Sequence, residues 1–182
     1  MAKNDAPESK FHALLQEQVY NEFNGAQQYL AVAVYFDGSD LPQLAKFFYR
    51  KAVEERDHAM MLVQYLLDRD IHVEIPGVAA VRNQFDAPRD AVVLMLDQER
   101  TVTDQITRLA NVARDEGDYL GEQFIGWFLR EQVEEVAVMT TLLRVADRAG
   151  HNMFDLENYV AREIATGAAA DPAAPRIAGG AL

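Results

Sequence analysis

The sequence contains no cysteine, which excludes disulfides, thiolate metal sites and cysteine nucleophiles. No stretch approaches the ~20 apolar residues of a membrane span, and the start of the chain has no hydrophobic core that would mark a secretory signal. Basic residues are few, with 17 Lys and Arg against 29 Asp and Glu, so the net charge is −12. An acidic surface repels phosphate, which argues against nucleic-acid binding. We therefore expect a globular cytoplasmic protein with no membrane or nucleic-acid partner, in which histidine and carboxylate hold any metal.

Apolar residues recur at three- and four-residue steps along most of the chain, which predicts an all-α protein. We expect four long helices at about residues 10–37, 42–70, 88–116 and 119–149, and a short fifth helix at about 153–164. The candidate N-cap residues are Ser9, Asp40 and Asn152. The candidate stop signals are Gly38, Gly117 and Gly150.

The links between the predicted helices differ in length. The first and third links are short, so the helices on either side should be antiparallel neighbours. The link from about residue 71 to 89 is long, and at ~3.3 Å per residue it can reach about 60 Å, the full length of such a bundle. The third helix can therefore run parallel to the second, which predicts a four-helix bundle with one long crossover.

The last residues differ in composition from the rest of the chain. We interpret residues 1–166 as one domain and residues 167–182, which are rich in alanine, glycine and proline, as a flexible C-terminal tail. A second interpretation is that the apolar end of this tail docks the chain to a larger partner.

Each long helix carries one glutamate near its middle, within its apolar stripe: Glu22, Glu55, Glu99 and Glu135. Residues at the middle of a helix meet at one level whichever way the helices run. His58 follows Glu55 by three residues, so the two side chains share one face. The sequence therefore predicts one Glu-x-x-His pair with three further glutamates converging on it.

One such glutamate alone is commonly a buried acid with a basic partner, and Lys51, one turn before Glu55, is the best candidate partner. Four glutamates at the same depth in the bundle need a different explanation. Like charges 4 Å apart repel by about 4 kcal/mol at an effective dielectric constant of about 20, against a total domain stability of ~5–15 kcal/mol. Either a cation occupies the cluster or several glutamates are protonated when it is empty. Two divalent metal ions bridged by a carboxylate would satisfy the charges.

These residues match a known motif over about residues 9–166. Glu22, the run Val53-Glu54-Glu55-Arg56-Asp57-His58-Ala59, Glu99 and the run Glu131-Gln132-Val133-Glu134-Glu135 resemble the ferroxidase motif of ferritins, and most closely that of non-haem bacterial ferritins of the actinobacterial, or mycobacterial, type. The resemblance implies a ferritin-like bundle with a di-iron site. Glu22, Glu55 and His58 would hold one iron, and the bridging Glu55 would hold the second with Glu99 and Glu135. Gln132 would lie beside these ligands or contact oxygen species.

The resemblance also implies a third iron site at Glu54, Glu131 and Glu134, facing the interior of a cage; a solvated acidic face is the alternative. Tyr29 would lie beside the di-iron site, and ordinary core packing is its alternative. Arg56 stands where bacterioferritins carry a haem-ligand methionine, so no haem is expected. We interpret the other histidines, His12, His72 and His151, as surface residues.

The implied function is iron storage. The chain would oxidise Fe(II) with O₂ or H₂O₂ and keep ferric mineral inside a hollow cage of 24 copies of itself. In that cage the long crossover would form the dimer contact, and the fifth helix would pack around a four-fold axis. Two alternatives remain open: a di-iron oxidase or peroxidase without storage, and a cargo protein docked through its C-terminal tail.

Overall fold

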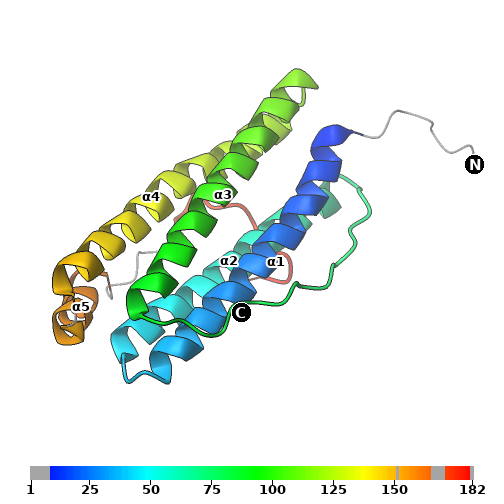
Figure 1. Ribbon diagram of the computed structural model, residues 1–182. Helices are drawn as coiled ribbons and strands as arrows, with labels where there is room; N and C mark the ends of the chain where they lie inside the picture. The colour runs from blue at the N-terminus through cyan, green and yellow to red at the C-terminus, as the bar shows by residue number, and fades with distance from the viewer. Residues whose placement is uncertain (1–8, 151, 165–170, 181–182) are drawn as a thin grey trace, which may run out of the picture.

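The computed structural model describes residues 9–150, 152–164 and 171–180, and these residues contain helices and no strand. Four long helices form the body of the molecule: α1 (Lys10–Asp37), α2 (Pro42–Asp68), α3 (Pro88–Asp115) and α4 (Tyr119–Ala149). They lie as two antiparallel hairpins, α1 with α2 and α3 with α4 (Figure 1). The short α5 (Met153–Tyr159) continues into a π-helical turn, η1 (Val160–Ile164), at one end of the bundle. The predicted all-α bundle with a short fifth helix is confirmed.

Helix ends follow local capping chemistry, with two differences from the sequence-based expectation. Ser9 caps α1, because its hydroxyl accepts a hydrogen bond from the His12 amide at 3.2 Å. Asp40 caps nothing: α2 begins after Leu41, and Asp40 itself takes a positive φ of 57° in the turn. Asn152 precedes α5 but makes no cap bond, because its side chain donates instead to Asp155 at 2.8 Å.

The second and third helices are shorter than predicted by one or two residues. α2 ends at Asp68 rather than residue 70, since Asp70 adopts a left-handed φ of 57° that a helix cannot continue through. α3 ends at Asp115, followed by Gly117 with a φ of 72°. Periodicity marks the body of a helix well and its last turn poorly.

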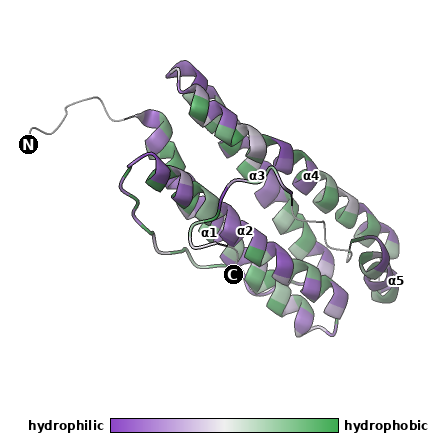
Figure 2. Cartoon of the chain, turned by 180° about the vertical axis from the view of Figure 1, so that it is seen from behind, coloured by the Kyte–Doolittle hydropathy of each residue, from purple (hydrophilic) through white to green (hydrophobic). Residues whose placement is uncertain are grey.

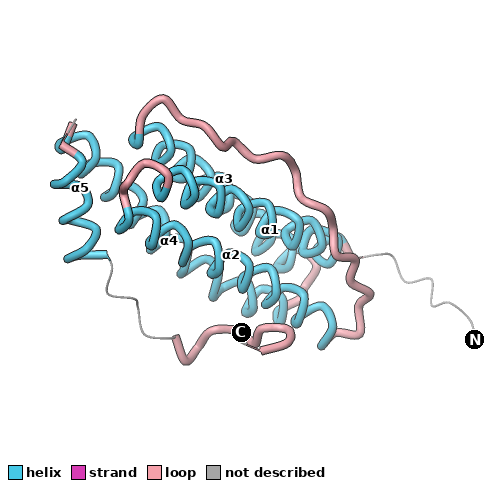
Figure 3. The backbone as a smooth tube through the Cα atoms, turned by 90° about the horizontal axis from the view of Figure 1, so that it is seen from below, coloured by secondary structure: helices cyan, strands magenta, loops and turns pink. Residues whose placement is uncertain are grey.

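The crossover, residues 69–87, runs along the outside of α1 to the far end of the bundle (Figure 3). Amide side chains of α1 hold it by its backbone. Gln16 pairs with both backbone groups of Glu74, at 2.6 and 3.3 Å, and Gln28 pairs in the same way with Arg82, at 2.8 and 2.9 Å. Because the crossover spans the bundle, α3 starts beside the start of α2 and runs parallel to it, as predicted.

The core consists of two apolar clusters, one in each half of the bundle. One contains Phe36, Phe48, Met95, Leu142 and, from the end of the bundle, Leu156 of α5. The other contains Phe11, Leu15, Leu62, Ile106 and Phe128. Figure 2 shows hydrophobic and hydrophilic residues alternating along each long helix, as expected for helices with one buried face. No described helix is both long enough and apolar enough to cross a membrane. The buried polar residues lie between the two clusters, at the middle of the bundle.

The described part of the C-terminal tail, residues 171–180, lies against the bundle on the side opposite the crossover (Figure 3). Asp171 accepts a hydrogen bond from the Trp127 indole at 2.8 Å, and the Ala178 amide donates to the Met60 carbonyl at 3.1 Å. Ile177 packs against the second apolar cluster. The flexibility expected for residues 167–182 stays a prediction. The contacts themselves could not be predicted, because composition says nothing about a surface that α2 and α4 provide. Residues 167–170, 181 and 182 lie outside the described part of the chain.

Candidate metal centre

The structure brings the four mid-helix glutamates and His58 together between the two apolar clusters. Each long helix contributes one glutamate, and none of the five side chains is more than a few per cent exposed: Glu22 1%, Glu55 2%, His58 3%, Glu99 1% and Glu135 4%. Burial follows from the sequence, because each glutamate occupies a position in the apolar stripe of its helix.

The most compact part of this cluster is formed by Glu22, Glu55 and His58, whose candidate ligand atoms all lie within 4.8 Å of one another. The Nδ1 atom of His58 lies 3.8 Å from Glu55 Oε2. The imidazole ring is held edge-to-face by Trp127 and Phe128, with ring centroids 5.6 and 5.7 Å apart. Two carboxylates and an imidazole at this spacing can bind one divalent ion.

The other two glutamates, Glu99 and Glu135, are held by neighbours from facing helices and belong to no compact group of three. The Tyr29 hydroxyl donates a hydrogen bond to Glu99 Oε1. The Lys51 ammonium donates to Glu135 Oε1, and also to Glu54 Oε2 at 2.9 Å. Tyr29 therefore lies beside the cluster, as the resemblance implies. Lys51 pairs with Glu135 and Glu54 rather than with Glu55, because its long side chain reaches across to α4.

One oxygen of each of the four glutamates is buried without a hydrogen-bond partner in the described structure: Glu22 Oε2, Glu55 Oε1, Glu99 Oε2 and Glu135 Oε2. A buried acceptor without a partner costs about 1–3 kcal/mol, and more when it is charged. Four such oxygens, one from each helix, are a donor set that a hard cation would satisfy.

Burial raises the pKa of three carboxyl groups in the cluster. The pKa of Glu22 lies well above its ordinary value because of burial, to which the charge of Glu55 adds. Burial, together with the charge of Glu55, raises the pKa of Glu99 to about 8. Burial raises the pKa of Glu135 to about 7, against the lowering effect of Lys51. In the metal-free state Glu99 is therefore protonated at neutral pH, and burial favours the protonated form of Glu22 as well.

Two ion pairs neutralise the rest of the cluster. Burial lowers the pKa of His58, but the adjacent Glu55 carboxylate outweighs it and raises that pKa to about 10. Burial raises the pKa of Glu55, yet His58 holds it below its ordinary value. Burial also lowers the pKa of Lys51, but the carboxylates of Glu135 and Glu54 outweigh this effect and hold the pKa above its ordinary value. Protonated acids and two basic groups thus relieve the repulsion between four converging carboxylates.

A second acidic group adjoins the first. Glu54, His58 and Glu131 offer ligand atoms within 4.8 Å of one another, although Glu54 and Glu131 are only half-buried. Burial raises the pKa of Glu131. Glu134, which the resemblance assigns to the same site, is exposed and lies outside this group.

The structure adds residues whose roles sequence reasoning missed. Gln18 donates to Glu22 Oε1 at 2.7 Å, and the Thr103 hydroxyl hydrogen-bonds Gln132 Oε1 at 2.9 Å. Gln18 lies one turn before Glu22 on the same stripe, a signal that could have found it. Thr103 gives no such signal, because its contact with Gln132 joins two different helices.

The remaining histidines lie away from the cluster. His72 is exposed in the crossover, as expected. His12, predicted as a surface residue, is half-buried, and its Nε2 atom lies 3.6 Å from Asp118. The α1–α4 contact at that end of the bundle covers it. His151 falls outside the described residues.

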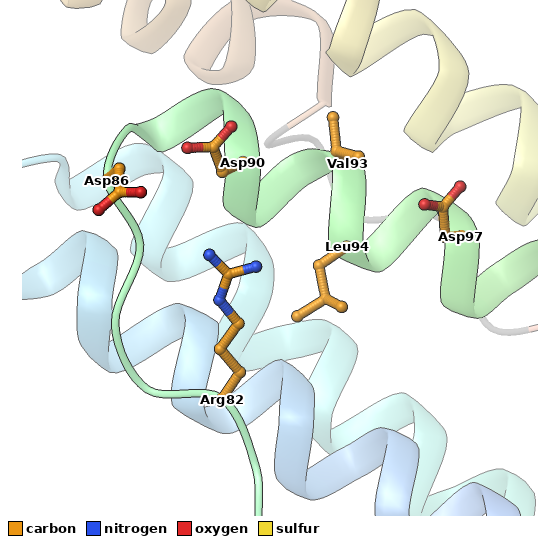
Figure 4. A pocket seen from close by; sticks show the side chains of 6 residues that line it. All are labelled: Arg82, Asp86, Asp90, Val93, Leu94 and Asp97. Atoms are coloured by element: carbon orange, nitrogen blue, oxygen red, sulfur yellow. The ribbon is translucent and has the colours of Figure 1, made fainter.

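A surface hollow of about 350 Å³ lies between the crossover and α3 (Figure 4). Its lining includes Arg82, Asp86, Asp90 and Asp97. It contains none of the predicted site residues.

Comparison with known proteins identifies the bundle and its cluster. Residues 12–149 match the family described as ferritin-like domain. The chain belongs to the ferritin family. Over all 182 residues, with both chains fully covered, this ferritin is 69% identical to a ferritin BfrB of Mycobacterium tuberculosis. The same protein of another strain, again 69% identical, is named bacterioferritin BfrB.

More distant relatives support the same assignment. A bacterial non-heme ferritin of Staphylococcus aureus is 34% identical over 145 residues, which cover 80% of this chain and 87% of the relative. Among solved structures, an open pore ferritin from the archaeon Archaeoglobus fulgidus superposes with a TM-score of 0.83 at 26% identity, covering 90% of this chain and 100% of that one.

Proposed function

We propose that this ferritin stores iron, and that the mid-bundle cluster is the ferroxidase centre at which Fe²⁺ is oxidised. The observation that carries the proposal is the set of four buried carboxylate oxygens without partners, one on each long helix. Hard oxygen donors with a single imidazole suit iron, and they stabilise its ferric state.

In this proposal Glu22, Glu55 and His58 bind the first ferrous ion, and Glu55 bridges to a second ion held by Glu99 and Glu135. Both ions are substrates that leave after oxidation. Ligand groups must be deprotonated to bind, so Glu22, Glu99 and His58 release protons as iron enters. Tyr29 orients the Glu99 carboxylate through its hydroxyl, and Gln132, fixed by Thr103, lies beside the ligands.

The oxidation balances with O₂ or peroxide as the electron acceptor. Two Fe²⁺ ions each give up one electron. O₂ accepts both electrons with two protons and leaves as hydrogen peroxide, or peroxide accepts both with two protons and leaves as two water molecules. We propose that the ferric product then passes to Glu54 and Glu131, with the exposed Glu134 as a further contact on the way to the mineral.

We also propose the assembly that storage requires: a closed cage of 24 copies in the cytoplasm, since homo-oligomers favour closed symmetry. The crossover would lie at the contact between two copies, and α5 around a four-fold axis. We further propose that no haem is bound, because half-buried Arg56, paired with Asp57 at 3.2 Å, stands at the position of the haem-ligand methionine of bacterioferritins.

Size-exclusion chromatography after aerobic addition of excess Fe²⁺ to the metal-free protein tests the proposal. We expect ferric absorbance from hundreds of ions per shell to co-elute with a very large protein peak. The Glu55→Gln variant should assemble equally well but oxidise Fe²⁺ at least about 10-fold more slowly. Replacing even a residue that only hydrogen-bonds a metal ligand typically lowers activity about 10-fold or more.

Each alternative function has its own outcome. About two irons per chain on a small oligomer would indicate a di-iron oxidase or peroxidase without storage. A chain that takes up no iron and binds a larger protein through its tail would indicate a cargo protein; against this, residues 171–180 are engaged with their own bundle.

A further inference from the structure

Lys51 joins two sets of carboxylates that iron would use. It lies on α2, one turn before Glu55, and its side chain is only 10% exposed. Its ammonium donates to Glu135 Oε1, part of the proposed second iron position, and to Glu54 Oε2 at 2.9 Å, part of the adjoining acidic group. One buried ammonium group is therefore paired with a carboxylate of each proposed iron position.

Iron and this ammonium compete for the same carboxylates. A divalent ion bound to the partnerless Glu135 Oε2 would lie close to the ammonium on Oε1 and repel it. A buried charge is costly without a partner, so the ammonium then depends on Glu54. Conversely, an ion bound to Glu54 leaves the ammonium with Glu135. If both carboxylates held metal, the buried Lys51 ammonium would face a divalent ion at each of its two partners.

We propose that Lys51 is a positioning residue that disfavours metal at Glu135 and Glu54 at the same time. The inference rests on the proposed function. If Lys51 has this role, iron passes through the centre by occupying the positions at Glu135 and Glu54 in turn rather than filling both. The exchange needs only a rotation of the Lys51 side chain, because both contacts already exist without any displacement of α2 or α4.

Calorimetric titration of the metal-free, assembled protein with Zn²⁺ tests this inference. Zn²⁺ does not change oxidation state, so binding is measured without ferroxidase chemistry. Lys51→Gln removes the charge but keeps a hydrogen-bond donor, and Lys51→Arg keeps the charge. The matched control is Lys46→Gln, which removes the same charge from an exposed position on the same helix.

We expect wild type to bind two ions per chain tightly and a third more weakly. Lys51→Gln should bind the third ion more tightly by at least about 5-fold, the lower end of usual coupling between two sites. Lys51→Arg and Lys46→Gln should match wild type. A Lys51→Gln isotherm equal to that of wild type would overturn the inference, as would an equal gain in Lys46→Gln.

A second variant keeps the test decisive if Lys51→Gln does not assemble. Glu54→Gln takes away the alternative partner of the ammonium, so Lys51 should hold Glu135 more firmly and weaken binding of the second ion. Unchanged affinity for that ion would also overturn the inference.

The two proposals fail in different ways. If Glu55→Gln binds Zn²⁺ as well as wild type does, the proposed metal centre is wrong. If Glu55→Gln loses tight binding while the Lys51 variants behave as wild type, only the role of Lys51 is wrong.

Discussion

Glu99 and His58 keep their protons at pH values at which the same side chains in water would have lost them. Burial raises the pKa of Glu99 to about 8, and the Glu55 carboxylate raises that of His58 to about 10. A group that binds a proton more tightly in the folded state stabilises that state below its unfolded pKa, and this stability is lost as the pH rises through the folded pKa. Stability is therefore lost between about pH 4.5 and pH 8 through Glu99, and between about pH 6.5 and pH 10 through His58.

The metal-free protein should therefore become less stable between pH 7 and pH 10, by up to about 1.4 kcal/mol per pH unit for each group that titrates. Midpoints of thermal unfolding across this range measure the effect. Glu99→Gln should lose less stability than wild type between pH 5 and pH 8, since Gln has no proton to release. Parallel curves for wild type and Glu99→Gln would contradict the raised pKa.

The position of each site glutamate could be predicted from the sequence, because the 3.6-residue period assigns a residue to a face of its own helix. Contacts between side chains of different helices could not be predicted in this way. Lys51 was expected to pair one turn away on α2, and it pairs instead with Glu135 on α4 and with Glu54. The bond between Thr103 and Gln132 depends likewise on how α3 and α4 face each other.

At the scale of elements, Gly121 of α4 lies against Phe11 of α1. A Cβ atom at this position would lie only 2.3 Å from Cε1 of the buried Phe11 ring. Gly121→Ala should therefore destabilise the protein by about 1–3 kcal/mol, the usual cost of overpacking a core. A lower midpoint of thermal unfolding would report the effect.

Gly126, five residues further along α4, is the matched control because a Cβ there would meet no atom within 4 Å. Gly126→Ala should stabilise the protein by about 0.5–1 kcal/mol, since glycine is a poor helix former. If both variants changed stability in the same direction, the close approach of Phe11 would be contradicted.

Trp127 reports whether the C-terminal tail is docked, because it is the only tryptophan in the sequence. Its indole donates to Asp171, and the residue is 6% exposed with the tail in place. Removing residues 167–182 should expose the indole to water and shift its emission to longer wavelength. Asp171→Asn, which keeps an acceptor oxygen, should leave the emission near that of wild type. Identical emission from the truncated protein would mean that the tail is not docked in solution.

The two hairpins and the crossover could be predicted from helix period and link length. The path of the tail could not be predicted, because its small residues carry no period, and the surface that it contacts exists only once α2 and α4 have folded. Asp40 was also misjudged: the turn needs a left-handed residue there, and aspartate serves that purpose as well as capping.

At the scale of the whole molecule, all four long helices contribute a buried glutamate to the proposed metal centre, so this cluster forms only when both hairpins are assembled. The chain also carries a net charge of −12, which attracts cations over a distance set by the salt concentration. Raising the ionic strength from 0.01 to 0.15 M shortens that distance from about 30 Å to about 8 Å.

Iron uptake at subsaturating Fe²⁺ should therefore slow severalfold over this range of salt, because screening lowers the concentration of Fe²⁺ near the acidic protein surface. The oxidation rate at saturating Fe²⁺ should stay nearly constant and serves as the control. Initial rates of ferric absorbance measure both. Uptake that does not depend on salt would show that the acidic surface does not guide iron.

The crossover is held through its own backbone, by Gln16, Asn24 and Gln28 of α1. Part of its path is thus encoded in a neighbouring helix, while its own side chains Ile71, Val73 and Phe85 pack against the core. Exposed residues of the crossover that lie outside the proposed contact between two copies can change while the connection stays in place. A foreign peptide could be grafted at such residues, provided that the three α1 amides are left unchanged.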